Sequence, residues 1–183
     1  MSNLEALHLS PAIAAALERL GWSADDAAVR EAAPTAARGH NLVTVTPPIP
    51  AYATPTLAGL LSRLGQGGRA LLLCPAGQLD EWGGLVHRLG GEAGLRVQVA
   101  HGTARALRRL RNNAVDLLVA TPETAMALHR RSALGPEGIT AILLAWPESW
   151  EDEATLAPLM QDLPKEAQRI VHTAAPERTG DLV

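Results

Sequence analysis

The chain has very little lysine and cysteine and no phenylalanine at all. Its single cysteine, Cys74, ends the apolar run Leu71–Cys74, which excludes a disulfide framework and predicts a buried, inert thiol. Lys165 is the only lysine, so arginine carries almost all of the positive charge. No basic stretch followed by an apolar run opens the sequence, and no apolar segment approaches the length of a membrane span. We expect a cytoplasmic protein without a membrane partner.

Long blocks of one charge are also absent. Charged residues make up 19% of the chain, hydrophobic residues 47%, and the formal net charge is −3, a composition that excludes a disordered protein. A length of 183 residues is enough to bury one substantial core. The overall charge gives no argument for nucleic-acid binding.

Short apolar runs alternate with longer amphipathic stretches through most of the chain. The expected strands span Leu42–Val45, Ala70–Cys74, Leu95–Ala100, Asp116–Ala120, Ala141–Ala145 and Arg169–Thr173. The expected helices span Thr56–Leu64, Gln78–Leu89, Ala104–Asn112, Pro122–Arg130 and Glu153–Asp162. This alternation predicts a single α/β domain with a doubly wound, mainly parallel sheet and helices on both faces.

Residues 1–40 precede the first expected strand and have a helical pattern. Ser10 and Pro11 suit the start of a helix that ends at Leu20, and Ser23 suits the cap of a second helix that ends at Ala33, before Pro34. We expect a helical leader at 1–40 packed on a domain at 41–183. The chain stops soon after its last expected strand, so we expect it to be part of a longer protein.

Short motifs follow the expected strands in a fixed order. Pro34 and Gly39 precede the first strand, and the later strands are followed by Pro75–Leu79, His101–Thr103 and Thr121–Thr124. In order and spacing these motifs resemble the amino-terminal RecA-like domain of DEAD-box helicases, over about residues 7–183. The resemblance implies the RecA-like fold and two ligands, ATP with magnesium and single-stranded RNA.

The positions that the resemblance assigns to the nucleotide have lost the family's residues. Val29 stands where the family has a glutamine that reads adenine. The end of the phosphate-binding loop, Gly-Ser-Gly-Lys-Thr in the family, is here Ile49, Pro50, Ala51, Tyr52 and Ala53. The family's Asp-Glu-Ala-Asp is replaced by Ala145, Trp146, Pro147 and Glu148. Its Ser-Ala-Thr is replaced by Thr173, Ala174 and Ala175.

These replacements remove the chemistry of a phosphate site. Such a loop needs glycines that let backbone N–H groups converge, a lysine that neutralises the terminal phosphates, and a hydroxyl that holds magnesium. Pro47, Pro48 and Pro50 have no N–H, and Tyr52 stands in place of the cation. We expect no catalytic residue, no metal site and no ATP or magnesium cofactor.

The positions that the resemblance assigns to nucleic acid are partly retained. They comprise Pro75, Gly77, Gln78, Gly102, Thr121, Pro122 and Thr124. Two arginines of the family are replaced by Gly77 and Thr124, which weakens phosphate contacts. Helical spacing places Arg105, Arg108 and Arg109 on one face, where they form either a phosphate-binding stripe or an ordinary solvated surface.

Aromatic and histidine side chains near the expected nucleotide cleft have several interpretations. Trp146 and Trp150 either stack a base, fill the space of a lost nucleotide or anchor a partner protein. We favour the filling of the cleft, with Tyr52 helping to close it. His172 has no catalytic partners in the sequence, so we expect a packed histidine.

Three functional hypotheses follow from the sequence. The first is a catalytically inactive, DEAD-box-like scaffold or interaction module that works with a second RecA-like domain or a partner protein. The second is a module that binds single-stranded RNA or DNA without nucleotide. The third is part of an ATP-dependent helicase with an atypical nucleotide site.

Overall fold

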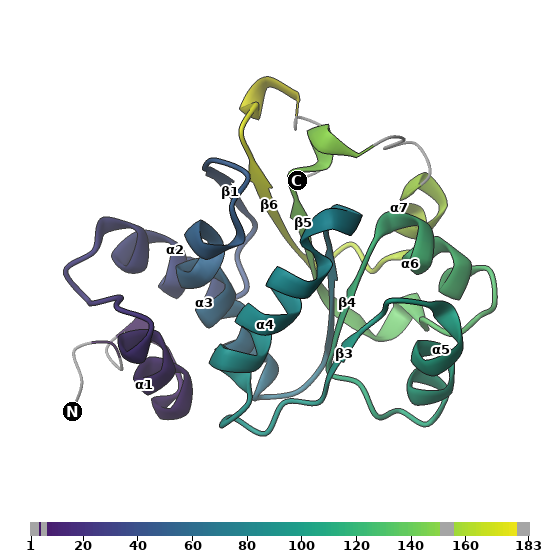
Figure 1. The fold of residues 1–183 in the computed structure, drawn as a ribbon, viewed down its shortest axis with the longest axis horizontal. Coiled ribbons are helices and arrows are strands. Elements are labelled where there is room, and N and C mark those ends of the chain that lie inside the picture. The colour runs from purple at the N-terminus through teal and green to yellow at the C-terminus, as the bar shows by residue number, and fades with distance from the viewer. Residues whose placement is uncertain (1–3, 5–6, 151–155, 179–183) are drawn as a thin grey trace.

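The computed structural model describes residue 4 and residues 7–150 and 156–178, and its centre is one parallel sheet (Figure 1). Its six described strands are β1 (Leu42–Val45), β2 (Arg69–Leu73), β3 (Val97–Val99), β4 (Leu117–Ala120), β5 (Ile139–Ala145) and β6 (Gln168–Thr173). They lie in the order β1-β6-β5-β2-β4-β3, and every neighbouring pair is parallel. All strands therefore end at the same edge of the sheet.

Helices cover both faces of the sheet. They are α1 (Pro11–Arg19), α2 (Ala27–Ala37), α3 (Thr54–Leu64), α4 (Leu79–Gly90), α5 (Thr103–Arg111), α6 (Pro122–His129) and α7 (Ala157–Asp162). Figure 1 shows α1 to α4 on one side and α5 to α7 on the other. The core is divided in the same way: Leu72 and Leu143 pack with the first group of helices, and Leu71 and Ile142 with the second. The predicted doubly wound α/β class is confirmed.

The first two helices share the core of the sheet. Ile13 and Leu17 of α1 and Val29 of α2 are fully buried in the same cluster as Leu57 of α3. Ser10 and Pro11 begin α1, as the sequence predicts, because proline fits the first helical turn, where its missing N–H is not needed.

The predicted limits of α2 are wrong at both ends. Asp26, rather than Ser23, precedes its first turn, while Ser23 forms a turn with the Asp26 carboxylate. The helix also continues through Pro34 instead of ending before it. Pro34 has no N–H to donate to the carbonyl of Arg30, and Arg30 is an exposed residue of the helix.

The other predicted elements exist, and most of them, though not β1, have shifted ends. The third strand is the shortest, because only Val97–Val99 of the expected Leu95–Ala100 pair with β4. The last helix is described from Ala157, and the start predicted for it at Glu153 lies outside the described residues. Within the described residues no helix is long and apolar enough to cross a membrane.

Candidate functional site at the carboxyl edge of the sheet

The motif positions meet where the strands end. The loop after β1 (residues 46–53), the turn after β5 (residues 146–149) and the residues after β6 lie side by side there, because β6 pairs with both β1 and β5. In parallel α/β sheets this edge is the usual ligand-binding edge. It is therefore the candidate site of this protein.

The loop after β1 uses its own backbone donors. Pro47, Pro48 and Pro50 have no N–H, and the N–H groups of Ile49, Tyr52 and Thr54 donate to carbonyls inside the loop, those of Pro47, Ile49 and Ala51. Residues Pro50–Ala53 form a 3₁₀ turn that runs directly into α3. These donors do not converge on a shared point, which is what a phosphate-binding loop requires.

Trp146 fills the space behind this loop. It is 1% exposed, and its Nε1–H donates to the carbonyl of Thr46 at 3.1 Å. Its ring centroid lies 5.9 Å from that of Trp82 and 5.9 Å from that of His172. The backbone of Trp146 is left-handed, with φ 49°, a conformation that is uncommon for a bulky residue. The buried position of Trp146 therefore agrees with the expectation that a large aromatic side chain fills this space.

Gln78 provides a second attachment for the loop. Its Nε2 donates to the carbonyl of Pro48 at 2.9 Å, and its Oε1 accepts from Trp82 Nε1 at 3.4 Å. This side chain, assigned by the resemblance to the nucleic-acid face, thus connects α4 to the loop after β1. Two side chains from different elements hold the loop against the sheet.

Tyr52 does not close the cleft as expected, because it is 48% exposed. Its place in the 3₁₀ turn points its ring to the surface, and the neighbouring Ile49 is 47% exposed. Among the other replaced positions, Val29, Ala53 and Ala145 have no exposed surface, whereas Ala51 and Ala174 are exposed. Sequence position alone did not distinguish Trp146, which is buried, from Tyr52, which is exposed.

Glu148 connects the strand-end motifs to each other. Its Oε1 accepts from the N–H of Ala174 at 2.6 Å, while the hydroxyl of buried Thr173 accepts from the N–H of Ala175 at 2.9 Å. The N–H of Trp146 donates to the carbonyl of His172 at 2.7 Å. Among the described residues no group of His, Cys, Asp and Glu side chains has an arrangement that holds a metal ion.

His172 is a packed, fully buried histidine. It has no exposed surface, and neither ring nitrogen has a hydrogen-bond partner among the described residues. The hydroxyls of Thr44, its partner across the β1–β6 ladder, and Thr46 are likewise buried without a partner there. Burial lowers the pKa of His172 from 6.5 to about 4, so the ring is neutral near pH 7.

The groove on the nucleic-acid side of this edge is apolar and acidic. Pro75, Pro122, Trp150 and Glu123 line it together with Ala76 and Ser149, and its volume is about 330 Å³. Thr121 caps α6 through a hydrogen bond from the N–H of Thr124. Gly77 and Gly102 lie exposed near this edge. Of the described residues that line this groove, only Glu123 is charged, and a carboxylate repels phosphate.

The expected arginine stripe separates into two parts. Arg105 and Arg108 are exposed, whereas Arg109 is half-buried and donates to the carbonyls of Val97 and Ala114 at 3.0 Å each. Arg109 also donates to Gln98 Oε1 at 3.0 Å. The Arg109 side chain therefore turns toward β3, whereas those of Arg105 and Arg108 are exposed.

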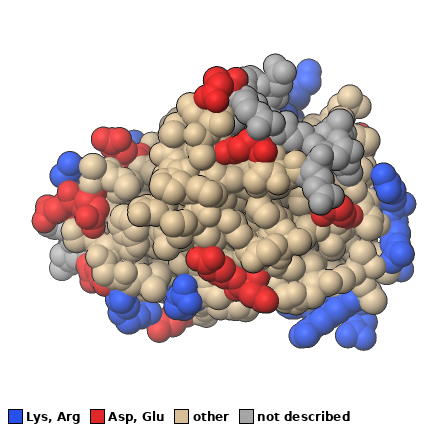
Figure 2. Space-filling view, turned by 45° about the horizontal axis from the view of Figure 1, so that its top comes forward, with Lys and Arg blue, Asp and Glu red and all other residues tan. Residues whose placement is uncertain are grey.

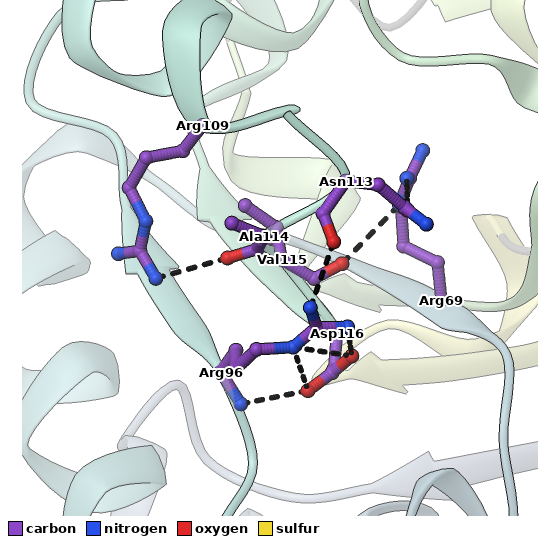
Figure 3. Close-up of polar contacts among 7 residues, drawn as sticks. All are labelled: Arg69, Arg96, Arg109, Asn113, Ala114, Val115 and Asp116. Carbon is purple, nitrogen blue, oxygen red and sulfur yellow. Dashed lines mark hydrogen bonds and ion pairs between the residues drawn. The ribbon is translucent and has the colours of Figure 1, made fainter. Parts of the chain in front are cut away.

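Arg109 belongs to a polar cluster at the opposite, amino edge of the sheet (Figure 3). Arg69 donates to the carbonyls of Val115 and Leu134 and to Asn113 Oδ1. Arg96 pairs with Asp116 and donates to the carbonyl of Asn113, and this pairing lowers the pKa of Asp116. No sequence motif marks Arg69, Arg96 or Asp116, so their contacts were not predicted.

Comparisons with solved structures identify the fold. The RNA helicase Prp28 from Chaetomium thermophilum bound to ADP matches with a TM-score of 0.74 and 19% identity, over 95% of this chain and 45% of that chain. S. cerevisiae Dbp5 bound to Nup159, Gle1, IP6 and ADP matches with a TM-score of 0.74 and 15% identity, over 91% of this chain and 46% of that one. S. cerevisiae Dbp5 bound to RNA and ADP BeF3 matches with a TM-score of 0.71 and 15% identity, over 95% of this chain and 46% of that one. The chain thus spans about half the length of these structures.

Searches at the level of sequence give no assignment. No protein-family model matches the chain. No curated protein matches it either. At identities of 15 to 19% the structural likeness shows the fold alone, which is the RecA-like fold of a DEAD-box helicase domain.

Proposed function

We propose that this chain is a catalytically inactive RecA-like domain that acts in the cytoplasm as a scaffold or interaction module, without binding or hydrolysing ATP. The observation that carries the proposal is Trp146, which is buried behind the loop after β1 and bonded to it through Thr46. A nucleotide held as in an active domain would need that loop to offer its N–H groups and a cation. Here prolines, internal hydrogen bonds and Tyr52 stand in their place.

The proposal includes the expected domain division and partners. A helical leader at 1–40 stabilises a RecA-like domain at 41–183, and a second RecA-like domain or a partner protein binds to it. The lengths of the similar structures agree with this, since each is about twice as long as the matched region. One of those structures holds S. cerevisiae Dbp5 bound to Nup159 and Gle1, so a protein that contains this fold assembles there with other proteins.

The nucleic-acid alternative has less support at the carboxyl edge. Its groove presents Glu123 rather than an arginine, and Gln78 is already bonded to the loop after β1. Phosphate binding depends on charge neutralisation, which this edge does not supply. A helicase with an atypical nucleotide site would additionally need a cation in place of the missing lysine, whose position is held by Tyr52.

Isothermal titration calorimetry with ATP and magnesium tests the proposal. We expect no saturable heat with the wild-type chain. The Trp146→Ala variant is the matched second sample, because it opens the space behind the loop but leaves the missing cation and donors unchanged, and we expect no saturable heat there either. Saturable binding by the wild-type chain would overturn the proposal. Binding by the variant alone would show that Trp146 is the sole obstacle.

A further inference from the structure

Positive charge is concentrated at one end of the molecule. Residues 101–115 and 124–136 contain six arginines and none of the chain's 19 Asp and Glu residues. The remainder of the chain has ten Lys and Arg residues against those 19 carboxylates, out of 16 cationic residues in all. Figure 2 shows basic side chains gathered at the right-hand end, where Figure 1 places α5 and α6, whereas basic and acidic groups alternate at the left.

Five of these six arginines are exposed and form what we call the arginine end. They are Arg105, Arg108, Arg111, Arg130 and Arg131. The bond from Arg131 Nη1 to Thr103 Oγ1, at 3.1 Å, places the end of α6 beside the start of α5. Arg105, Arg108 and Arg111 follow at intervals of three residues along the outer side of α5. The arginine end therefore extends along the whole of α5, about 12 Å at 1.5 Å per residue.

These guanidinium groups are not neutralised within the described part of the chain. The ion pairs found there join Arg19 to Glu92, Arg96 to Asp116, His101 to Asp80 and His129 to Asp162, and none includes a member of the arginine end. By contrast, Arg109 on the same helix is committed to backbone carbonyls. Among the described residues, the exposed arginines thus have no carboxylate partner.

We propose that the arginine end binds a short acidic segment of a partner protein. Guanidinium groups pair with carboxylates through two parallel hydrogen bonds, and about 12 Å accommodates three or four residues of an extended peptide. A nucleic-acid strand longer than this would leave the arginine end and meet a surface with an excess of carboxylates. This inference rests on the interaction-module part of the proposed function and names the chemistry of its partner.

Fluorescence anisotropy at low salt tests the inference with a labelled octaglutamate peptide and an oligothymidylate of equal formal charge. We expect octaglutamate to bind, and Arg105→Glu with Arg108→Glu to weaken its affinity about tenfold or more. The matched control is Arg30→Glu with Arg88→Glu, which reverses two exposed arginines on α2 and α4 and should change the affinity less than about twofold. Arg105→Gln with Arg108→Gln provides a milder variant if the charge reversal impairs folding.

Three outcomes would overturn the inference. The first is tighter binding of oligothymidylate than of octaglutamate, which would assign this surface to nucleic acid. The second is an equal loss in the control, which would show a general charge effect. The third is no binding of either probe, which would indicate that the arginine end is an ordinary solvated surface. The ATP titration reports on the nucleotide proposal separately, because α5 and α6 contribute nothing to the loop after β1.

Discussion

At the scale of single residues, His172 makes the stability of the protein depend on pH. Its pKa is about 4 in the folded chain and near 6.5 when unfolded, so the unfolded state binds the proton first as the pH falls. The contribution of the neutral ring is fully present above pH 6.5 and is lost between pH 6.5 and 4. We expect a loss of about 3 kcal/mol in the free energy of unfolding across this window.

Urea unfolding of the wild-type chain and of His172→Leu at several pH values measures this effect. The variant lacks the titrating ring but retains an apolar side chain of similar size, so its stability should decline less over the same window. Carboxylates titrate equally in both proteins, so their contributions cancel when the two free energies of unfolding are subtracted. Parallel curves for the two proteins would contradict the prediction.

Arg109 is expected to stabilise the fold, unlike its neighbour Arg108. Replacing Arg109 with Met retains the aliphatic stem but leaves the carbonyls of Val97 and Ala114 without their donor, so we expect a loss of about 2 kcal/mol. Arg108→Met, one position earlier on the exposed side of α5, should change the stability by less than about 0.5 kcal/mol. Chemical denaturation compares the two, and similar losses would refute the structural role of Arg109.

At the scale of elements, the close contact between α2 and α3 depends on Gly59. A Cβ atom at Gly59 of α3 would lie 2.2 Å from the carbonyl oxygen of Ala33 and 2.8 Å from Cβ of Ala36, both in α2. Gly59→Ala should therefore destabilise the protein by about 2 to 3 kcal/mol by separating α2 from α3.

Gly84 of α4 is the matched control for Gly59. A Cβ atom there would have only Arg88 Nη1 within 4 Å, at 3.5 Å, and this is the end of a flexible side chain. Gly84→Ala should stabilise the protein by about 0.5 to 1 kcal/mol, because alanine loses less conformational freedom in a helix. Thermal melts of both variants should move in opposite directions, and a common direction would argue against the close packing of α2 on α3.

The elements themselves were largely predictable from sequence, because apolar periodicity and strand-end motifs are local signals. Leu42–Val45 matches β1 at both ends, and the remaining strands differ by one or two residues at an end. Pro34 misled the prediction for α2, because the packing of that helix on α3 offsets the cost of a proline inside a helix, about 3 kcal/mol.

The contacts of the candidate site were less predictable than its position. The replaced motif residues could be located by spacing, but the sequence could not indicate that Trp146 turns inward with a left-handed backbone while Tyr52 turns outward. It likewise could not indicate that Gln78 and Arg109 bond to backbone carbonyls distant in sequence. Such contacts depend on how the strands are ordered in the sheet, which is a property of the folded chain.

At the scale of the whole molecule, the carboxyl edge has become part of the core. Trp82, Trp146 and His172 connect α4, the end of β5 and β6, where the wall of a nucleotide cleft would otherwise lie. The buried area of these aromatic rings stabilises the fold. Stability that does not depend on a ligand suits a scaffold.

This view predicts how the protein responds to the loss of an aromatic residue and to nucleotide. Trp146→Ala should lower the free energy of unfolding by about 3 to 5 kcal/mol, whereas Trp150→Ala, which removes a half-buried ring, should lower it less. ATP with magnesium should leave the melting temperature of both variants and of the wild-type chain unchanged, because a ligand stabilises only a state to which it binds. Scanning calorimetry with and without ATP measures both effects. A melting temperature of the wild-type chain that rises with ATP concentration would show that the carboxyl edge still opens to a nucleotide.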